Sequence, residues 1–296
     1  MHLSKLINLL ICPVCQNEHL VLVSKKISCQ KCHHSYPVCK NIPIMLTDSL
    51  DNQELSQKEI FNHHYRKFSQ VNYKLENWRL SMLNRIFNHS FTKSINTYLD
   101  IGCGATGYTV IEASKRGIPL SIGCDISLEA MIKAKNLAKL QKVSHNTAFV
   151  VSSAQNLPFK KKYFDYISLV SILEHLENDD LTIKSISSSL TPKGFLFICV
   201  PNTYRKIPIF LWPFYYHTDL KLGHKRHYSI EKLNDLLNKY KFKNITYVYN
   251  GHLLKFLQLF LDKIKANNDK RWWSIENNDI NKNQSGVQLN TIYQKK

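Results

Sequence analysis

The sequence of 296 residues predicts an α/β protein with a doubly wound, largely parallel sheet, preceded by a small cysteine-rich segment. From residue 95 onward, short apolar stretches alternate with segments at helical spacing, and such βαβ alternation is typical of a parallel sheet. A glycine-rich loop, Gly102 to Gly107, follows the first of these strands. Four cysteines form two C-x2-C pairs within the first 32 residues. These three observations carry the fold prediction.

Composition excludes several classes of protein. A hydrophobic content of 44% in a chain of this length supports a sizeable core, so a disordered protein and a disulfide-stapled miniprotein are both excluded. The densest apolar run, residues 207–216, contains two prolines and is too short to span a membrane. The apolar piece Leu6 to Ile11 is too short for a signal peptide. We therefore expect a cytoplasmic protein.

The charge is strongly positive and unevenly distributed. The net charge is +18, and residues 201–296 contribute +10 of it. Only seven of the 40 basic residues are arginine, the side chain best suited to reading phosphates and bases. The charge therefore favours an anionic acceptor or surface near the C-terminal third and gives weaker support to a nucleic-acid partner.

The N-terminal cysteines predict a structural metal site. Cys12 and Cys15 form the first pair, Cys29 and Cys32 form the second, and 13 residues separate them. Two such pairs direct four thiolates at one point, which is the closed tetrahedral shell of a structural zinc ion. Two disulfides, or a ribbon that folds without metal, are the alternatives.

The segment from Leu6 to Leu46 resembles a known family. The two cysteine pairs are followed by Ser35-Tyr36-Pro37-Val38 and by Asn41-Ile42-Pro43-Ile44. In this order the pieces are similar to the small zinc-ribbon family of methyltransferase activator proteins. We assign residues 1–47 to such a ribbon and residues 48–94 to a linker with N-terminal helices. Within that linker Phe61, Tyr65, Phe68 and Trp78 form either a lid over a ligand or ordinary packing contacts.

The remaining chain divides into alternating elements. We expect residues 95–296 to form the main domain, with 251–285 as an insertion. The expected strands are 96–101, 119–124, 148–151, 166–171, 194–200, 244–250 and 288–293, and the last two should form an antiparallel hairpin. We expect helices at 74–91, after the glycine loop as far as Arg116, and at 128–141 with Ser127 as its cap. A further helix should begin after the capping residue Ser229.

The glycine loop has two possible ligands. Gly102, Gly104 and Gly107 spell G-x-G-x-x-G after a strand, and Asp125 follows about twenty residues later, which is typical of a dinucleotide site. However, Asp100 stands two residues before the first glycine. A carboxylate there is unfavourable beside a pyrophosphate and favourable beside a cationic ligand such as S-adenosylmethionine.

The wider set of motifs resembles class I S-adenosylmethionine-dependent methyltransferases of the ubiquinone and menaquinone biosynthesis type, which have a Rossmann-like doubly wound sheet. The motifs are Leu99-Asp100-Ile101-Gly102-Cys103-Gly104, Gly123-Cys124-Asp125-Ile126-Ser127, Ser153-Ala154-Gln155-Asn156-Leu157-Pro158-Phe159, Phe164-Asp165-Tyr166-Ile167, Leu173-Glu174-His175-Leu176 and Leu190-Thr191-Pro192-Lys193-Gly194.

The resemblance implies a cofactor site. It implies that Asp100 organises the amino group of the cofactor and that Asp125 accepts the ribose hydroxyls. Two departures are present: the family's third glycine is displaced to Gly107, and Ser153 stands where an acid is common. The implied cofactor-binding residues are Asp100, Gly102, Gly104, Asp125, Ile126, Ser153, Ala154, Val170 and Ser171.

Three histidines are candidates for a catalytic base that takes a proton from the acceptor. His175 follows the fourth strand, and His224 and His227 lie in Gly223-His224-Lys225-Arg226-His227-Tyr228-Ser229. That heptapeptide resembles a stretch after the fifth strand of related methyltransferases. Loop or capping roles are the alternative for each histidine.

We therefore expect a methyltransferase that uses S-adenosylmethionine and a structural zinc ion and acts on a small or lipid-linked acceptor. Apolar and basic residues predict peripheral membrane contact through 207–216 and 251–265. The alternatives are a ribosomal or transfer RNA base methyltransferase, and a non-catalytic zinc-ribbon scaffold that has kept a cofactor fold.

Overall fold

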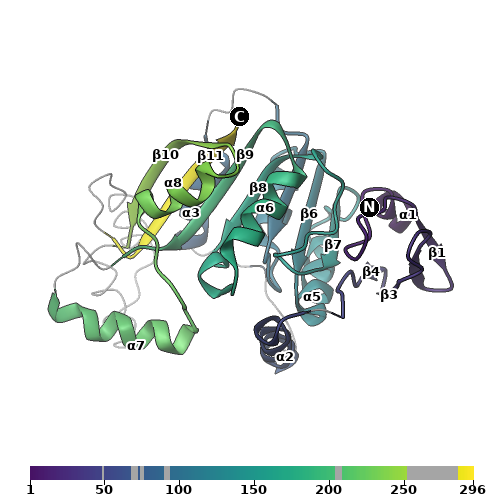
Figure 1. Cartoon of the computed structure of the whole chain (residues 1–296), viewed down its shortest axis with the longest axis horizontal. Helices are drawn as coiled ribbons and strands as arrows, with labels where there is room; N and C mark the ends of the chain where they lie inside the picture. The colour runs from purple at the N-terminus through teal and green to yellow at the C-terminus, as the bar shows by residue number, and fades with distance from the viewer. Residues whose placement is uncertain (49, 68–72, 74–76, 90–93, 204–208, 252–285) are drawn as a thin grey trace.

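A computed structural model describes the chain except residues 49, 68–72, 74–76, 90–93, 204–208 and 252–285. Its centre is a seven-stranded mixed sheet in the order β10-β11-β9-β8-β5-β6-β7 (Figure 1). Neighbouring strands from β9 to β7 run parallel, and β11 is antiparallel to both of its neighbours. The strands are β5 (Thr97–Ile101), β6 (Leu120–Asp125), β7 (Thr147–Val151), β8 (Phe164–Val170), β9 (Leu190–Pro201), β10 (Phe242–Asn250) and β11 (Gln288–Lys295).

The expected α/β fold with a doubly wound sheet is confirmed. Each predicted strand overlaps an observed one, and β10 and β11 form the expected antiparallel hairpin. The central strands are apolar on both faces because helices cover both: four of the five residues of β5 are buried. The predicted insertion and the apolar stripe at 251–265 fall almost entirely on residues 252–285, outside the described part.

Helices pack on both faces of the sheet. α4 (Tyr108–Lys115) and α5 (Leu128–Leu140) share one apolar cluster with β7, whereas α6 (Asp179–Ser189) and α8 (Ile230–Asn238) share another and lie together on the opposite face (Figure 1). Ser127 caps α5, as predicted: its hydroxyl accepts a hydrogen bond from the Ala130 N–H at 3.1 Å. Ser229 caps α8 in the same way, because its hydroxyl accepts from the Lys232 N–H at 3.2 Å. α6 was not predicted, since its sequence is mostly polar.

The N-terminal segment is joined to the main sheet by backbone and core contacts. It contains α1 (Leu3–Ile7) and a four-stranded sheet of β1 (Leu20–Val23), β2 (Lys26–Cys29), β3 (Ser35–Cys39) and β4 (Ile42–Pro43). The Met45 N–H donates to the Val151 carbonyl at 2.8 Å and the Ile11 N–H to Pro158 at 3.0 Å. Because the two parts also share an apolar cluster, the segment is positioned by the same core as the sheet.

Three more helices complete the described chain. α2 (Asn52–Lys67) runs below the edge of the sheet and contacts α5, and α3 (Asn77–Phe87) falls within the predicted helix 74–91 (Figure 1). The described part of the densest apolar run, residues 209–216, forms the short turn η3 (Ile209–Leu211) and the start of α7 (Trp212–Leu222). Among the described residues no helix combines the length and the apolar character needed to cross a bilayer.

Candidate functional site

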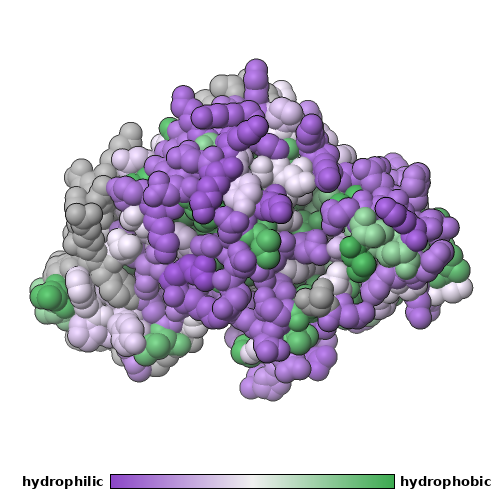
Figure 2. All heavy atoms as spheres, in the orientation of Figure 1, coloured by the Kyte–Doolittle hydropathy of each residue, from purple (hydrophilic) through white to green (hydrophobic). Residues whose placement is uncertain are grey.

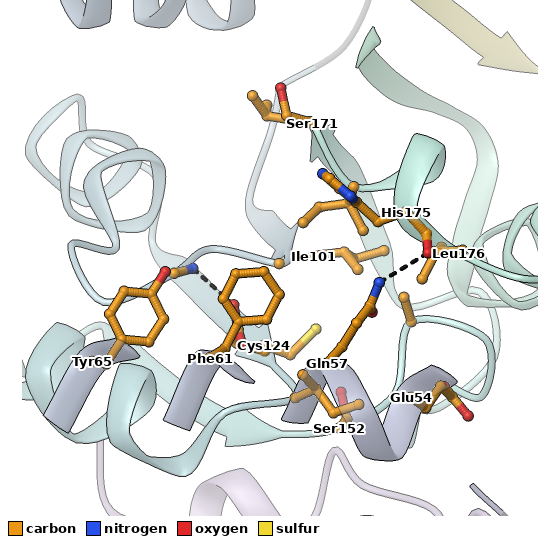
Figure 3. A pocket seen from close by; sticks show the side chains of 17 residues that line it. Glu54, Gln57, Phe61, Tyr65, Ile101, Cys124, Ser152, Ser171, His175 and Leu176 are labelled. Atoms are coloured by element: carbon orange, nitrogen blue, oxygen red, sulfur yellow. Dashed lines mark hydrogen bonds between the residues drawn. The ribbon is translucent and has the colours of Figure 1, made fainter. Parts of the chain in front are cut away.

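A cleft with a cavity volume of about 280 Å³ opens at the carboxyl ends of the central parallel strands, where α/β proteins bind their ligands (Figure 3). One wall is a face of α2 and the opposite wall is the loop after β8. Seven of the nine predicted cofactor-binding residues line it: Gly102, Gly104, Asp125, Ile126, Ala154, Val170 and Ser171. Ile101, Cys124, Ser152, Ile172 and Leu176 line it as well.

The glycine loop brings backbone to the surface of the cleft. Gly102 and Gly104 have φ values of +71° and +62°, in the left-handed region that side chains disfavour. A Cβ at Gly102 would lie 2.2 Å from Cδ1 of Ile172, which is too close for any side chain. The Gly102 N–H donates to the Cys124 carbonyl at 2.8 Å and fixes the loop against β6. Glycine is therefore required at Gly102 by both conformation and space.

Asp125 presents a carboxylate at the end of β6. Its Oδ1 accepts from the Ser127 N–H at 2.9 Å and its Oδ2 accepts from the Gly104 N–H at 3.1 Å. Burial raises the pKa of Asp125, while these backbone donors act in the opposite direction. A carboxylate has about four acceptor sites, so the side chain keeps capacity for two ligand hydroxyls.

Asp100 does not line the cleft, contrary to the sequence-based expectation. Its side chain is 3% exposed and accepts hydrogen bonds from the hydroxyls of Thr109 and Ser168. Burial raises its pKa to about 7, although these two hydroxyls oppose the shift. Successive side chains of a strand point to opposite faces, so Ile101 at the end of β5 faces the cleft and Asp100 lies behind the glycine loop. Asp100 can therefore act on a ligand only through the loop or through its charge.

Ser153 is the second predicted residue that lies off the cleft. Its neighbours Ser152 and Ala154 line the cleft, whereas the Ser153 hydroxyl donates to Oε1 of Glu54 on α2. The polypeptide turns at this point, so consecutive side chains face different cavities. Ser153 thus joins the sheet to α2.

Glu54 is a cleft residue that the sequence analysis missed. It is 7% exposed and belongs to a capping box: Asp51 Oδ1 accepts from the Glu54 N–H at 2.7 Å, and Glu54 Oε2 accepts from the Asp51 N–H at 3.3 Å. The pattern Asp51-x-x-Glu54 is a sequence signal for the start of a helix and could have located α2. It would not have placed the carboxylate in the cleft.

The cleft-facing side of α2 continues along the helix. Gln57, Phe61 and Tyr65 follow Glu54 at helical spacing, and all three line the cleft (Figure 3). Phe61 and Tyr65 therefore occupy the lid position. Phe68 and the side chain of Trp78 lie outside the described residues.

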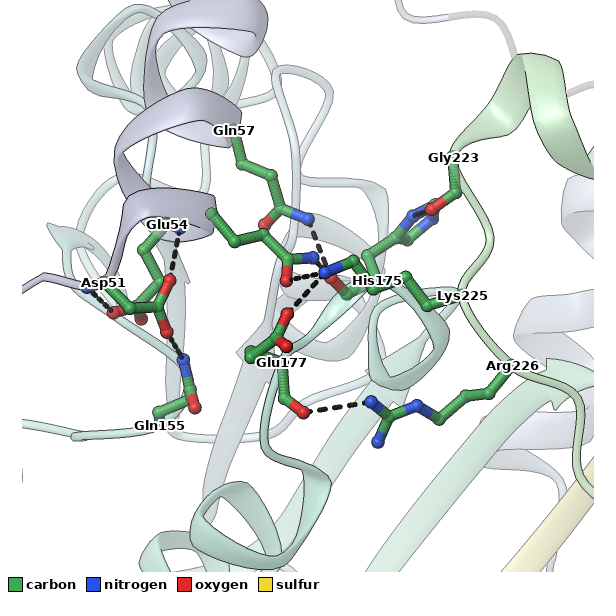
Figure 4. Close-up of polar contacts among 10 residues, drawn as sticks. Asp51, Glu54, Gln57, Gln155, His175, Glu177, Gly223, Lys225 and Arg226 are labelled. Atoms are coloured by element: carbon green, nitrogen blue, oxygen red, sulfur yellow. Dashed lines mark hydrogen bonds and ion pairs between the residues drawn. The ribbon is translucent and has the colours of Figure 1, made fainter.

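α2 is also attached to the opposite wall. Gln57 Nε2 donates to the His175 carbonyl at 2.9 Å, and Gln53 donates to the same oxygen (Figure 4). Lys225 Nζ bridges Gln53 and Glu177. These contacts join α2 to the segment that carries His175.

The three candidate histidines lie together beside this wall. His175 lines the cleft, and its ring centroid is 5.0 Å from that of His224. His224 Nδ1 is 2.7 Å from Asp219 Oδ1, and His227 Nε2 is 2.9 Å from Asp219 Oδ2. Burial and the neighbouring His224 lower the pKa of His175, which favours the neutral imidazole that a base requires. His224 and His227 do not line the cleft.

The four N-terminal cysteines form a separate cluster. The Sγ atoms of Cys12 and Cys32 are 3.6 Å apart, those of Cys15 and Cys29 are 3.5 Å apart, and all four lie within 4.8 Å of one another. A disulfide requires about 2.05 Å, so the paired-disulfide alternative is wrong for this structure. Thiolates around one zinc ion at about 2.3 Å lie roughly 3.8 Å apart, which these distances approach.

Comparison with known proteins relates the main sheet to methyltransferases. Residues 99–198 match a family model described as a methyltransferase domain. Norajmaline N-methyltransferase from Rauvolfia serpentina is 32% identical over 101 residues, which are 34% of each chain. Demethylmenaquinone methyltransferase from Staphylococcus saprophyticus is 28% identical over 134 residues, 45% of this chain and 54% of that protein. The chain thus spans between a third and about half the length of these curated relatives.

Solved structures share the fold. Geranyl diphosphate C-methyltransferase from Streptomyces coelicolor, solved with Mg²⁺, geranyl diphosphate and S-adenosyl-L-homocysteine, superposes with a TM-score of 0.60. It is 10% identical, and the match covers 83% of this chain and 99% of that one. At this identity the likeness concerns the fold alone.

Asp100 is predicted to make stability depend on pH. Its pKa is about 7 in the folded protein against an ordinary value of 3.8, so folding favours the neutral acid. This contribution is complete below pH 3.8 and is lost as the pH rises through 7. Asp100→Asn carries a neutral group at every pH, so relative to wild type its free energy of unfolding should increase by about 2–4 kcal/mol across this range.

Urea denaturation at several pH values measures this difference. Asp235→Asn, an exposed site on α8, is the control and should show little change. A difference between wild type and Asp100→Asn that stays constant with pH would contradict the prediction.

Proposed function

We propose that this protein transfers a methyl group from S-adenosylmethionine to a small-molecule acceptor. The match at residues 99–198 and the methyltransferase relatives support an S-adenosylmethionine-dependent enzyme. The observation that carries the proposal is the combination of the Asp125 carboxylate and the exposed backbone of Gly102 and Gly104 in one cleft. The residues that line it include the acids Glu54 and Asp125 and no lysine or arginine, a balance that suits a cationic ligand better than the pyrophosphate of a dinucleotide.

The residues of the cleft have distinct tasks. When bound, S-adenosylmethionine supplies a methyl group on a sulfonium leaving group. Asp125 would accept the ribose hydroxyls, and the backbone of Gly102 and Gly104 would lie against the methionine end. Ser152 and Ala154 would flank the adenine, while Ile126 would pack against it. Val170 and Ser171 would line the methionine side, and α2 would exclude water from the reacting atoms.

The acceptor would lie near His175, on the side of the cleft opposite α2. In the transfer step the acceptor's lone pair forms the new bond to the methyl carbon, the carbon–sulfur bond breaks, and its electron pair remains on sulfur. The acceptor's proton must leave, and His175 is the only one of the three candidate histidines that lines the cleft. His175 is therefore the residue we assign as the base.

Asp125 provides the direct test of cofactor binding. Asp125→Ala removes two charge-assisted hydrogen bonds of about 1.5–3 kcal/mol each, so the affinity for S-adenosylhomocysteine should fall by at least tenfold. Isothermal titration calorimetry measures the affinity of wild type and of Asp125→Ala for S-adenosylhomocysteine. If wild type gives no binding heat and Asp125→Ala behaves identically, the enzyme proposal fails and the scaffold alternative is favoured.

We further propose that Glu54 supplies the carboxylate that is missing at Ser153. The Glu54 side chain lies on the cleft wall and is bonded to Ser153 itself, so it places an acceptor beside the loop that would flank the adenine. The exocyclic amino group of adenine is a donor that such an acceptor would bind.

Glu54→Gln should therefore reduce discrimination for adenine. Wild type should bind S-adenosylhomocysteine about tenfold or more tightly than the analogue in which inosine replaces adenosine, because the inosine carbonyl cannot donate. The glutamine side chain retains the capping box, and its amide can also donate to the inosine carbonyl. The variant should therefore bind S-adenosylhomocysteine and the inosine analogue with more similar affinities. Glu59→Gln on the exposed face of α2 is the matched control. Equal discrimination in Glu54→Gln and wild type would exclude this role.

We propose that Cys12, Cys15, Cys29 and Cys32 hold one structural zinc ion. The spacing of the Sγ atoms and the closed set of four thiols support this site. The ion would stabilise a ribbon that contacts the loop at 152–159: Asn156 Nδ2 donates to the Pro13 carbonyl at 3.0 Å, next to Cys12. A ribbon without metal would therefore loosen one wall of the cleft.

Cys29→Ser should lower the zinc content from one per chain and weaken S-adenosylhomocysteine binding severalfold. Cys39→Ser is the matched control, because Cys39 lies in the same ribbon but outside the cluster. Elemental analysis and calorimetry on both variants provide the measurements. Full zinc content in Cys29→Ser would contradict the assignment.

We propose that the acceptor is lipid-linked. Ile209, Phe210, Tyr216 and Leu220 on η3 and α7 are between 60% and 75% exposed, and green side chains gather at this end of the molecule in Figure 2. Exposed apolar and aromatic side chains on one helix suit an interfacial element. Two basic residues that follow α7 are already paired with acids, so they are less available to bind anionic headgroups: Lys225 pairs with Glu177, and Arg226 pairs with Asp179 at 3.0 Å.

Vesicle sedimentation separates this proposal from RNA methylation. Wild type should sediment with phosphatidylglycerol vesicles and pass over immobilised RNA at moderate salt. The double variant Phe210→Ser/Leu220→Ser should lose at least tenfold in vesicle affinity, since each buried side chain contributes about 1.5–3 kcal/mol. Ile60→Ser, at an exposed position on α2, is the control. Retention on RNA without vesicle binding would favour the RNA alternative.

A further inference from the structure

Glu174 is a buried carboxylate without a hydrogen-bond partner. It lies in η1 (Leu173–His175), directly before the residue that lines the cleft, and it is 1% exposed. Within the described residues neither of its carboxylate oxygens has a hydrogen-bond partner. Burying an unpaired carboxylate costs several kcal/mol, so the side chain needs either a proton or a cation.

Nitrogen and oxygen ligands surround this carboxylate. Glu174, His175 and His224 offer ligand atoms that lie within 4.8 Å of one another, and His224 Nε2 is 4.0 Å from Glu174 Oε1. Two atoms bound to one ion at about 2.1 Å lie roughly 3.0–4.2 Å apart, depending on the angle between them. The cluster is therefore close to the size of a metal site.

Asp219 on α7 holds His224 in the orientation a metal ligand needs. Its Oδ1 lies 2.7 Å from His224 Nδ1, and its Oδ2 lies 2.9 Å from His227 Nε2. When the Nδ1–H donates to Asp219, Nε2 carries a free lone pair, and that atom is the one nearest Glu174. A carboxylate that orients a histidine in this way is the usual second layer of a metal site.

We propose that Glu174, His175 and His224 bind a divalent first-row transition-metal ion at the edge of the cleft, with Asp219 as the positioning residue for His224. Two imidazoles and one carboxylate suit such ions and leave coordination positions open. Because His175 lines the cleft, the open positions would face the acceptor side.

The site deepens the proposed function and rests on it for its role. A bound ion lowers the pKa of a hydroxyl that coordinates it, so the acceptor class would be a phenol or an enol. Its O–H proton would pass to solvent, and its oxygen would then form the bond to the methyl carbon while the carbon–sulfur bond breaks toward sulfur. In this assignment His175 acts as a metal ligand, and the ion replaces it as the group that promotes loss of the acceptor's proton.

Manganese titration of the full chain tests the site. After the zinc content has been determined, Mn²⁺ binding is followed by electron paramagnetic resonance. Wild type should bind one Mn²⁺ per chain. Glu174→Gln and His224→Gln should each bind at least tenfold more weakly, as loss of a ligand typically requires. Glu177→Gln removes an exposed carboxylate three residues away and should bind as wild type does.

Binding of S-adenosylhomocysteine by the same variants shows whether each variant is folded. It also separates the metal-site proposal from the methyltransferase proposal. Retained cofactor binding with lost Mn²⁺ binding in Glu174→Gln supports the site. Cofactor binding in wild type without Mn²⁺ binding, or equal Mn²⁺ affinity in wild type and Glu174→Gln, overturns it and leaves Glu174 as a neutral acid. Mn²⁺ binding without cofactor binding would instead contradict the methyltransferase proposal alone.

Discussion

Backbone pairing between the N-terminal segment and Val151 lies beside one wall of the cleft. The Met45 N–H donates to the carbonyl of Val151, the last residue of β7, and Ser152 and Ala154, which follow it, line one part of the cleft. Met45 is followed along the chain by α2, which begins at Asn52. Because the ribbon and the wall share one anchor, α2 can begin only near Ser153, where Glu54 bonds to it. The ribbon thus contributes to the cleft without lining it.

The cleft combines a rigid floor with a wall of ionisable groups. The floor is backbone: Gly102 is held to β6, and Ile172 occupies the space that a side chain on it would need. On the far wall His175 lines the cleft, and Glu174, Asp219, His224 and His227 cluster behind it. Burial raises the pKa of Glu174 and lowers that of His175, which brings both groups into the range where proton chemistry is available near neutral pH. The net charge of +18 has little part in it, since Lys225 and Arg226 are paired with local acids.

Much of the fold could be predicted because its signals are local. Apolar strands, the glycine loop and the serine caps at Ser127 and Ser229 depend on residues within a few positions of one another, and the structure confirms them. The side chains of Asp100 and Ser153 point away from the cleft, because their directions depend on the register of β5 and on the turn after β7, and the roles of both residues toward the cofactor stay predictions. The zinc site stays a prediction supported by the cysteine geometry.

The sequence by itself determined the seven strands of the main sheet, the residues of the glycine loop, the acid at the end of β6 and the two cysteine pairs. Only the tertiary structure decided that Glu54 meets Ser153, 99 residues away, and that Glu174 meets His224. Hydrophobic periodicity specifies which face of an element is buried, but it carries no information about which distant element covers that face. The polar contacts that shape this cleft form between such elements, so they follow from packing.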